Sequence, residues 1–136
     1  MYSCKLIISC YGLDDVSLSV LKGVAPLPRF IHYFQPLKPL GGLPRRDRQI
    51  VILDESASLS EGDLCASIDG GAKRILCTSR PKNLSEKDLA LWDDVWVKPL
   101  SPAMLRFRFQ RILREIQAEK ALWTAQNQLN QTIDPL

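Results

Sequence analysis

Five short apolar runs constrain the fold of this chain more than any other feature of its sequence. Runs of this length, with little alternation between apolar and polar residues, are typical of strands that are covered on both faces. Such strands, separated by helices or long connections, form parallel sheets in α/β domains. The five predicted strands are KLIIS at 5–9, RFIHYF at 29–34, QIVIL at 49–53, KRILCT at 73–78 and DVWV at 94–97.

Most segments between these runs carry helix signals. Gly23 ends the first amphipathic segment, and Ser85 with Asp88 has the spacing of a capping box. Ser101 followed by Pro102 is a typical start of a helix, with proline at its first position. The predicted helices cover 13–22, 60–68, 86–92 and 102–132.

One connection departs from this alternation. Residues 36–48 contain three prolines and two adjacent glycines, which disfavour a regular helix because proline lacks the backbone donor and clashes with the preceding turn. We therefore expect a five-stranded, doubly wound α/β domain whose second helix is eroded and whose last helix is long.

Composition excludes several classes of protein. The chain is 46% hydrophobic and 24% charged over 136 residues, typical of one globular domain. No apolar run approaches the roughly 20 residues of a membrane span, and the amino terminus lacks the features of a signal peptide. Four cysteines without a CxxC pair and a single histidine argue against a zinc site. We expect a cytoplasmic protein with reduced thiols, no membrane partner and no cofactor.

Three polar residues follow predicted strands and should share one edge of the sheet. Asp54 follows VIL, Thr78 ends KRILCT, and Lys98 follows DVWV. In doubly wound sheets, functional sites form outside the carboxyl ends of the strands.

These residues resemble the receiver domain of response regulators in bacterial two-component signalling, over about residues 3–117. The resemblance rests on Asp54, on Thr78-Ser79 and on Lys98-Pro99. It implies a flavodoxin-like sheet in the order 2-1-3-4-5, with Asp54 as phosphoacceptor and Thr78 and Lys98 as phosphate contacts. It also implies a cis bond between Lys98 and Pro99, which only proline makes plausible.

The expected metal ligands are missing from this pattern. Phosphoryl transfer to an aspartate needs Mg²⁺, which takes hard oxygen ligands, and the family supplies two acidic residues directly after the first strand. Cys10 and Tyr11 stand there in this chain, and Asp14 and Asp15 come a few residues later. The start of a helix also explains two acidic residues at that point.

The departure leaves two functional hypotheses and a weaker third. The preferred one is a degenerate receiver in which Asp54 is phosphorylated weakly or not at all. The alternative is a competent, Mg²⁺-dependent receiver that an upstream histidine kinase or a small phosphodonor phosphorylates on Asp54, with Asp14 or Asp15 completing the metal site. The third is a flavodoxin-like binding domain, which lacks a glycine-rich phosphate loop to support it.

The last predicted helix carries two apolar seams in different phases. Residues 102–132 would form a helix about 46 Å long, which must project beyond a domain whose radius of gyration is near 13 Å. We expect a receiver-like domain over 1–117 and a helical linker over 118–136 that forms a coiled-coil homodimer, with a frayed tail as the alternative. The seam on the domain is Leu105, Phe109, Ile112 and Ile116, and the expected dimer contacts are Leu122, Trp123, Ala125 and Leu129.

The end of the chain suggests a role for this helix. Asp134-Pro135-Leu136 resembles the junction upstream of a diguanylate cyclase domain, and a linker before a PAS module is similar. We therefore expect a regulatory module, not itself an enzyme, that relays a signal along the helix to an output domain. The arginines of the last helix spread around its circumference, so no nucleic-acid partner is expected.

Overall fold

The structure is a computed structural model that describes residues 4–26, 30–34, 48–57 and 72–133. Side chains are described throughout these ranges except at residues 4, 123, 124 and 126–133. The predicted helix over 60–68, the proline-rich segment up to residue 47 and the residues after 133 lie outside these ranges. The expected loss of the second helix therefore stays a prediction.

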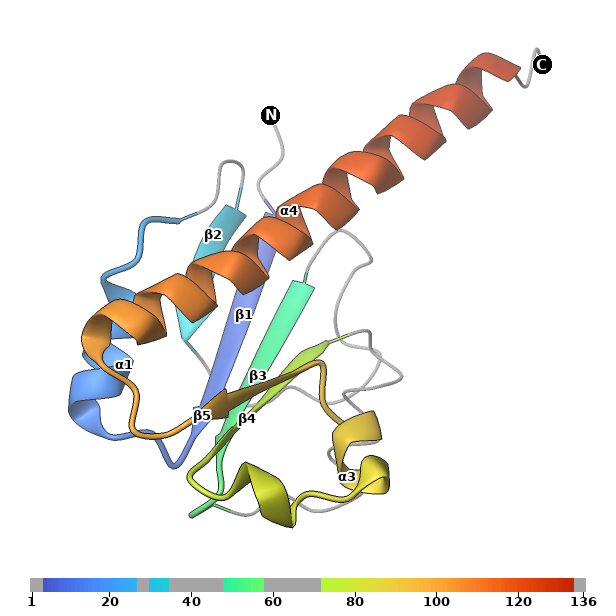
Figure 1. Ribbon diagram of the computed structural model, residues 1–136. Coiled ribbons are helices and arrows are strands. Elements are labelled where there is room, and N and C mark those ends of the chain that lie inside the picture. The colour runs from blue at the N-terminus through green and yellow to red at the C-terminus, as the bar shows by residue number, and fades with distance from the viewer. Residues whose placement is uncertain (1–3, 27–29, 35–47, 58–71, 134–136) are drawn as a thin grey trace.

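Five parallel strands form one sheet in the order β2-β1-β3-β4-β5 (Figure 1). This arrangement confirms the predicted fold class and strand order. β4 and β5 have the predicted bounds, whereas β1 and β3 extend beyond the apolar runs at both ends. The strands are β1 (Cys4–Tyr11), β2 (Phe30–Phe34), β3 (Arg48–Asp54), β4 (Lys73–Thr78) and β5 (Asp94–Val97).

Side-chain caps set the starts of the helices. The carboxylate of Asp14 accepts a hydrogen bond from Ser17 N–H at the start of α1, and Ser85 and Asp88 form the predicted capping box of α3. α3 ends at Ala90, two residues before the predicted end. The helices are α1 (Asp15–Lys22), the short 3-10 helix η1 (Pro81–Asn83), α3 (Glu86–Ala90) and α4 (Pro102–Ile133).

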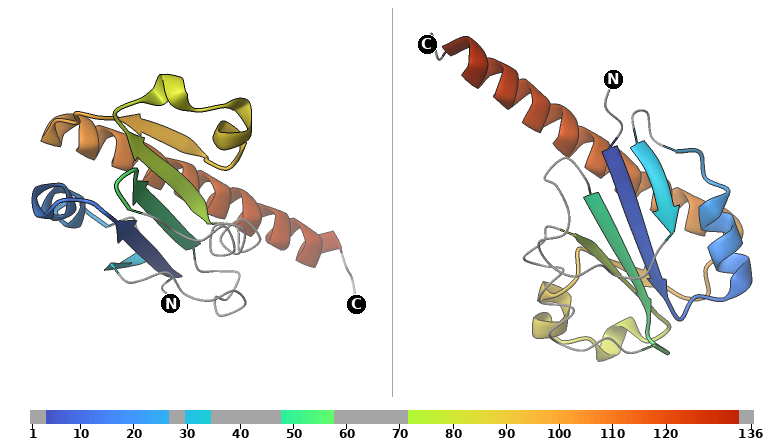
Figure 2. Two further views of the ribbon diagram at one scale, coloured as in Figure 1. Left: turned by 90° about the horizontal axis from the view of Figure 1, so that it is seen from below. Right: turned by 180° about the vertical axis from the view of Figure 1, so that it is seen from behind.

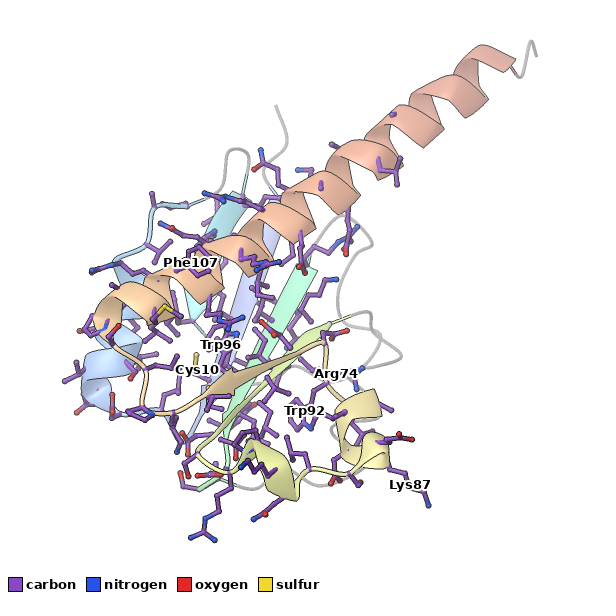
Figure 3. All side chains as sticks on the ribbon, in the orientation of Figure 1. Cys10, Arg74, Lys87, Trp92, Trp96 and Phe107 are labelled. Atoms are coloured by element: carbon purple, nitrogen blue, oxygen red, sulfur yellow. The ribbon has the colours of Figure 1, made fainter. Side chains whose placement is uncertain are left out.

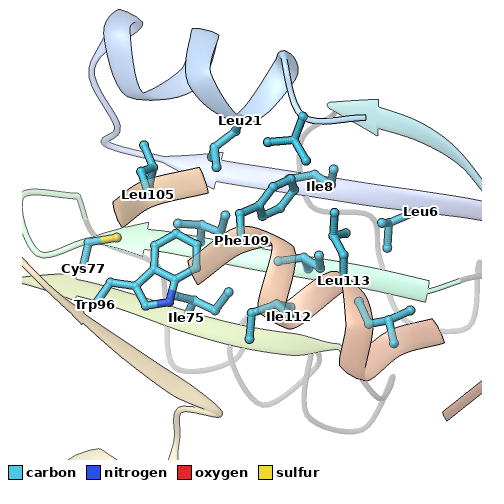
Figure 4. Packing of buried hydrophobic residues seen from close by; sticks show 14 of the residues in the cluster. Leu6, Ile8, Leu21, Ile75, Cys77, Trp96, Leu105, Phe109, Ile112 and Leu113 are labelled. Carbon is cyan, nitrogen blue, oxygen red and sulfur yellow. The ribbon is translucent and has the colours of Figure 1, made fainter. Parts of the chain in front are cut away.

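One face of the sheet carries the core that α1 and α4 cover (Figures 2 and 4). Alternate residues of neighbouring strands point to this face, as the pleat requires. Phe109 and Trp96 are completely buried there, and the Trp96 indole N–H donates to Asp94 Oδ2 at 2.8 Å. The core comprises Leu6, Ile8, Leu21, Val24, Phe30, Ile50, Ile52, Ile75, Cys77, Trp96, Leu105, Phe109, Ile112, Leu113 and Ile116.

The predicted seam of α4 is confirmed, because Leu105, Phe109, Ile112 and Ile116 are all buried against the sheet. Leu113 joins them. Full burial of a side chain of this size contributes roughly 1.5–3 kcal/mol. The seam therefore fixes the first half of the helix across the sheet.

Two polar contacts extend the docked part of α4. Glu119 forms an ion pair with Lys73 at 2.6 Å, and the Lys120 ammonium lies 4.5 Å from the centre of the Phe30 ring. Beyond them the helix leaves the domain and projects into solvent (Figure 1). Its 32 residues correspond to about 48 Å. Among the described residues, no helix combines the length and the apolar character that crossing a membrane requires.

Candidate functional site

The carboxyl edge of the sheet gathers the three residues that the sequence placed there. Asp54 and Thr78 are the last residues of β3 and β4, and Lys98 directly follows β5. Because β3, β4 and β5 are consecutive in the sheet, their ends are neighbours. The Lys98–Pro99 peptide bond is cis, as expected.

Asp54 and Lys98 form the centre of this site. The Lys98 ammonium lies 3.0 Å from Asp54 Oδ1 and 2.9 Å from Oδ2. Oδ1 also accepts a hydrogen bond from Ser56 N–H at 3.0 Å. Burial acts to raise the pKa of Asp54, but the bonds from Ser56 and Lys98 outweigh it and lower that pKa. The carboxylate is therefore charged near neutral pH. It is only 6% exposed, and both of its oxygens are engaged.

The hydroxyl of Thr78, one of the expected phosphate contacts, bonds to a carboxylate other than Asp54. Thr78 is buried, and its hydroxyl donates to Glu55 Oε2 rather than to Asp54. Ser79 donates to Glu55 Oε1 from its backbone N–H at 3.2 Å and from its hydroxyl at 2.7 Å. The Lys98 ammonium lies 3.5 Å from the same oxygen.

Glu55 is thus a site residue that sequence reasoning missed. Its backbone N–H is bonded to Cys77 O at 2.9 Å, which holds it against β4 just past the end of β3. The available signal was its position: a second acidic residue directly after Asp54 must lie at the same edge of the sheet. Nothing in the sequence indicated that it, and not Asp54, would receive the Thr78 hydrogen bond.

A cavity of about 620 Å³ opens beside the Asp54–Lys98 pair. The loop between β1 and α1 closes one side of it. Gly12 has a φ of +79° in this loop, and a Cβ there would lie 2.9 Å from Ala57 Cβ and 3.1 Å from Asp54 Cβ. Only glycine allows the loop to approach the base of Asp54 this closely. The lining includes Gly12, Asp14, Ser17, Asp54, Ser79 and Lys98.

Asp14 and Asp15, the acidic candidates for metal binding, both belong to the start of α1. Asp14 lines the cavity, but its carboxylate accepts from Ser17 N–H at 2.6 Å and caps α1. The hydrogen bond from Ser17 lowers the pKa of Asp14. Asp15 lies in the first turn of α1 and is exposed.

The residues that the structure describes at this site do not fit a Mg²⁺ ion. Burial raises the pKa of the Cys10 thiol to about 12, so a neutral sulfur stands where a hard oxygen ligand is needed. Within the described ranges, no group of three or more His, Cys, Asp or Glu side chains could hold a metal ion. Of the carboxylates that line the cavity, Asp54 binds Lys98 and Asp14 caps a helix.

Of the expected dimer contacts, the structure describes two side chains. Leu122 is 62% exposed and Ala125 is exposed, both on the projecting part of α4. The side chains of Trp123 and Leu129 lie outside the described set. An exposed leucine on a projecting helix is available to a partner, and dimerisation itself stays a prediction.

Comparison with known proteins gives little further guidance. No family model matches the chain, and no curated protein matches it. The crystal structure of a candidate pilus assembly protein (cpaE) from Burkholderia thailandensis is similar at 15% identity, covering 79% of this chain and 96% of that chain. Its TM-score of 0.42 is too low to support a conclusion about this chain. The fold is established by the sheet itself, and no family follows from these comparisons.

Proposed function

We propose that the chain is a receiver-like regulatory domain that works with little or no phosphorylation of Asp54. One observation carries this proposal. Asp54 occupies the end of β3 and is held by Lys98 through both oxygens, in a site whose described residues do not fit Mg²⁺. The five-stranded order β2-β1-β3-β4-β5 is the one that the resemblance to receivers implies.

The charge of the site explains why phosphorylation would be weak. A phosphoryl group carries about two negative charges and would place them next to a carboxylate. These charges require cations and hydrogen-bond donors. Lys98 provides one positive charge, which Asp54 and Glu55 already share. Without a divalent ion, the attack of one anion on another lacks the electrostatic stabilisation that metal ions supply in phosphoryl transfer.

The competent receiver is the second candidate, and one observation favours it. Asp14 lines the same cavity as Asp54 and Lys98. If the Asp14 carboxylate left its bond to Ser17, it would be the nearest candidate for a second metal ligand. This alternative predicts Mg²⁺-dependent phosphorylation of Asp54 by a histidine kinase or a small phosphodonor.

The signal output is proposed to pass through α4. The helix is fixed to the core by five buried residues and then projects with Leu122 exposed. We propose that this part pairs with the same helix of a second copy and connects to an output domain, such as a diguanylate cyclase. The domain described here would regulate that output and catalyse no reaction of its own.

Intact mass spectrometry after incubation with acetyl phosphate and Mg²⁺ tests the phosphorylation state. The proposal expects at most a minor adduct in the wild type. A near-complete adduct of one phosphoryl group that disappears in Asp54→Asn, but persists in the control Asp88→Asn, would establish the competent receiver instead. Asp88 suits as a control because its carboxylate is engaged in the capping box of α3 with Ser85.

Light scattering during size exclusion tests dimerisation on the same samples. A dimer is expected in the wild type, and Leu122→Gln should weaken it. Ala121→Gln is the matched control, because Ala121 is exposed on the same turn but is not one of the expected dimer contacts. A monomer at all concentrations would contradict the proposed role of α4.

A further inference from the structure

Four donor groups at the carboxyl edge converge on Glu55. The hydroxyls of Thr78 and Ser79 and the Ser79 N–H donate to its two oxygens, and Lys98 approaches within 3.5 Å. These groups come from the ends of two different strands, β4 and β5. The contacts therefore join the ends of three neighbouring strands through one side chain.

The chemistry of this donor set is that of an oxyanion site. Hydroxyl groups, a backbone N–H and an ammonium are the groups that proteins direct at carboxylates, phosphates and sulfates. None of the four is a hydrogen-bond acceptor toward Glu55. Any group that fills this position must therefore supply negatively charged or strongly accepting oxygens.

We propose that Glu55 is a built-in oxyanion ligand, whose carboxylate fills the position between Thr78, Ser79 and Lys98 and holds the strand ends together without an added ligand. Removing this carboxylate would leave the donor groups open to a free tetrahedral oxyanion, for which we take inorganic phosphate as the probe. The wild type, in contrast, would be closed to it.

Three details support this assignment. The bond from Glu55 N–H to Cys77 O fixes the backbone beside β4, so that the side chain starts in reach of its partners. The Thr78 hydroxyl accepts from Arg80 N–H at 3.0 Å, which orients its own proton toward Glu55. Hydrogen bonds from Thr78 and Ser79 lower the pKa of Glu55 to about 2, so the ligand is fully charged near neutral pH.

The assignment also gives Asp54 and Glu55 separate tasks. Asp54 binds Lys98 and Ser56, whereas Glu55 binds the two hydroxyl residues that follow β4. A ligand or a modification at this edge would have to displace Glu55 before it could use Thr78. In the absence of a ligand, Glu55 therefore holds Thr78 and Ser79 in one arrangement.

Chemical rescue by phosphate tests the inference. In Glu55→Ala, phosphate should produce saturable shifts of the amide NMR signals of Ser79 and Arg80 and raise the melting temperature, relative to chloride at equal ionic strength. The wild type should show neither local shift. Asp88→Ala is the matched control, because Asp88 also accepts from a serine N–H and hydroxyl but bonds to no lysine in the described structure.

Phosphate stabilises many proteins by exclusion from their surface, so the comparison is between variants. Equal effects in Glu55→Ala, Asp88→Ala and the wild type, or the absence of a saturable shift in Glu55→Ala, would overturn the inference. If Glu55→Ala does not fold, Glu55→Gln keeps the shape of the side chain and should respond to phosphate more weakly but still above the wild type.

The inference needs neither phosphorylation nor a dimer. Near-complete phosphorylation of Asp54 in the wild type would refute the proposed function and leave the rescue of Glu55→Ala unaffected. A missing rescue would refute the role of Glu55 and leave the proposed function in place. The two experiments therefore fail independently.

Discussion

Asp54 and Glu55 are consecutive carboxylates that the strand end directs to different partners. Both retain their charge near neutral pH, because hydrogen bonds and the Lys98 ammonium lower both pKa values. Lys98 lies between the two, and the hydrogen bond to Asp54 raises its own pKa. The three charged side chains therefore form an ion network at neutral pH. Protonation of the carboxylates in acid should break it.

Replacing Glu55 with Gln should make the melting temperature less sensitive to acid. The folded pKa of Glu55 is about 2, against an ordinary value of 4.5. A depressed pKa adds stability that is present above pH 4.5 and is lost as the pH falls toward 2. Melting curves of both proteins should differ most at neutral pH, with the wild type higher, and should converge below pH 4.5. A constant difference across this range would contradict the prediction.

The thiols at this edge should be slow to react. Burial raises the pKa of Cys77 to about 12, with a contribution from the charge of Asp54, and burial has the same effect on Cys10. Because the thiolate is the nucleophile, alkylation by iodoacetamide at pH 8 should modify both far more slowly in the folded protein than in urea. Peptide mapping assigns each modified residue, and rapid labelling of Cys77 in the folded state would count against its buried position.

At the scale of single elements, α4 combines a packed half and a projecting half. Phe109 is fully buried (Figure 4), while Phe107, two residues earlier on the same helix (Figure 3), is 52% exposed. The two residues are of the same type and lie two positions apart in one helix. Replacing each with alanine therefore changes helix propensity equally, and any difference in stability reports the packing of Phe109.

Phe109→Ala should therefore destabilise the domain by about 3–5 kcal/mol, the usual cost of removing a buried aromatic side chain. Phe107→Ala should stay within about 0.5 kcal/mol of the wild type, as is usual for surface substitutions. Urea unfolding followed by circular dichroism measures both. Similar losses in the two variants would mean that α4 is not docked by the face described here.

The contacts of Glu119 and Lys120 predict where α4 can be cut. A chain that ends at residue 121 keeps both contacts and should melt at the wild-type temperature, although it loses the exposed leucine. A chain that ends at 117, the domain boundary expected from the sequence, should melt lower, because an ion pair and a cation–π contact each contribute up to about 1 kcal/mol. Equal melting temperatures would place the boundary at 117.

At the scale of the whole molecule, the sheet could be predicted because its signal is local. Each apolar run marks a strand, and Asp54 and Lys98 meet because parallel strands end at the same edge. The end of α3 could not be predicted as well, since Leu91 and Trp92 continue the apolar pattern while the chain turns toward β5. The pairing of Thr78 with Glu55 could not be predicted either, because it depends on side-chain directions between two strands that are separated in sequence.

The docked base and free tip of α4 make it a lever arm. Thirteen residues, 121–133, follow Lys120, the last residue of α4 with a described contact to the sheet, which corresponds to an arm of about 20 Å. A tilt of about 5° at the base would move the tip by about 2 Å, on the scale of the helix shifts that accompany many allosteric transitions. Small adjustments of the core beneath Phe109 would thus be magnified at the far end of the helix.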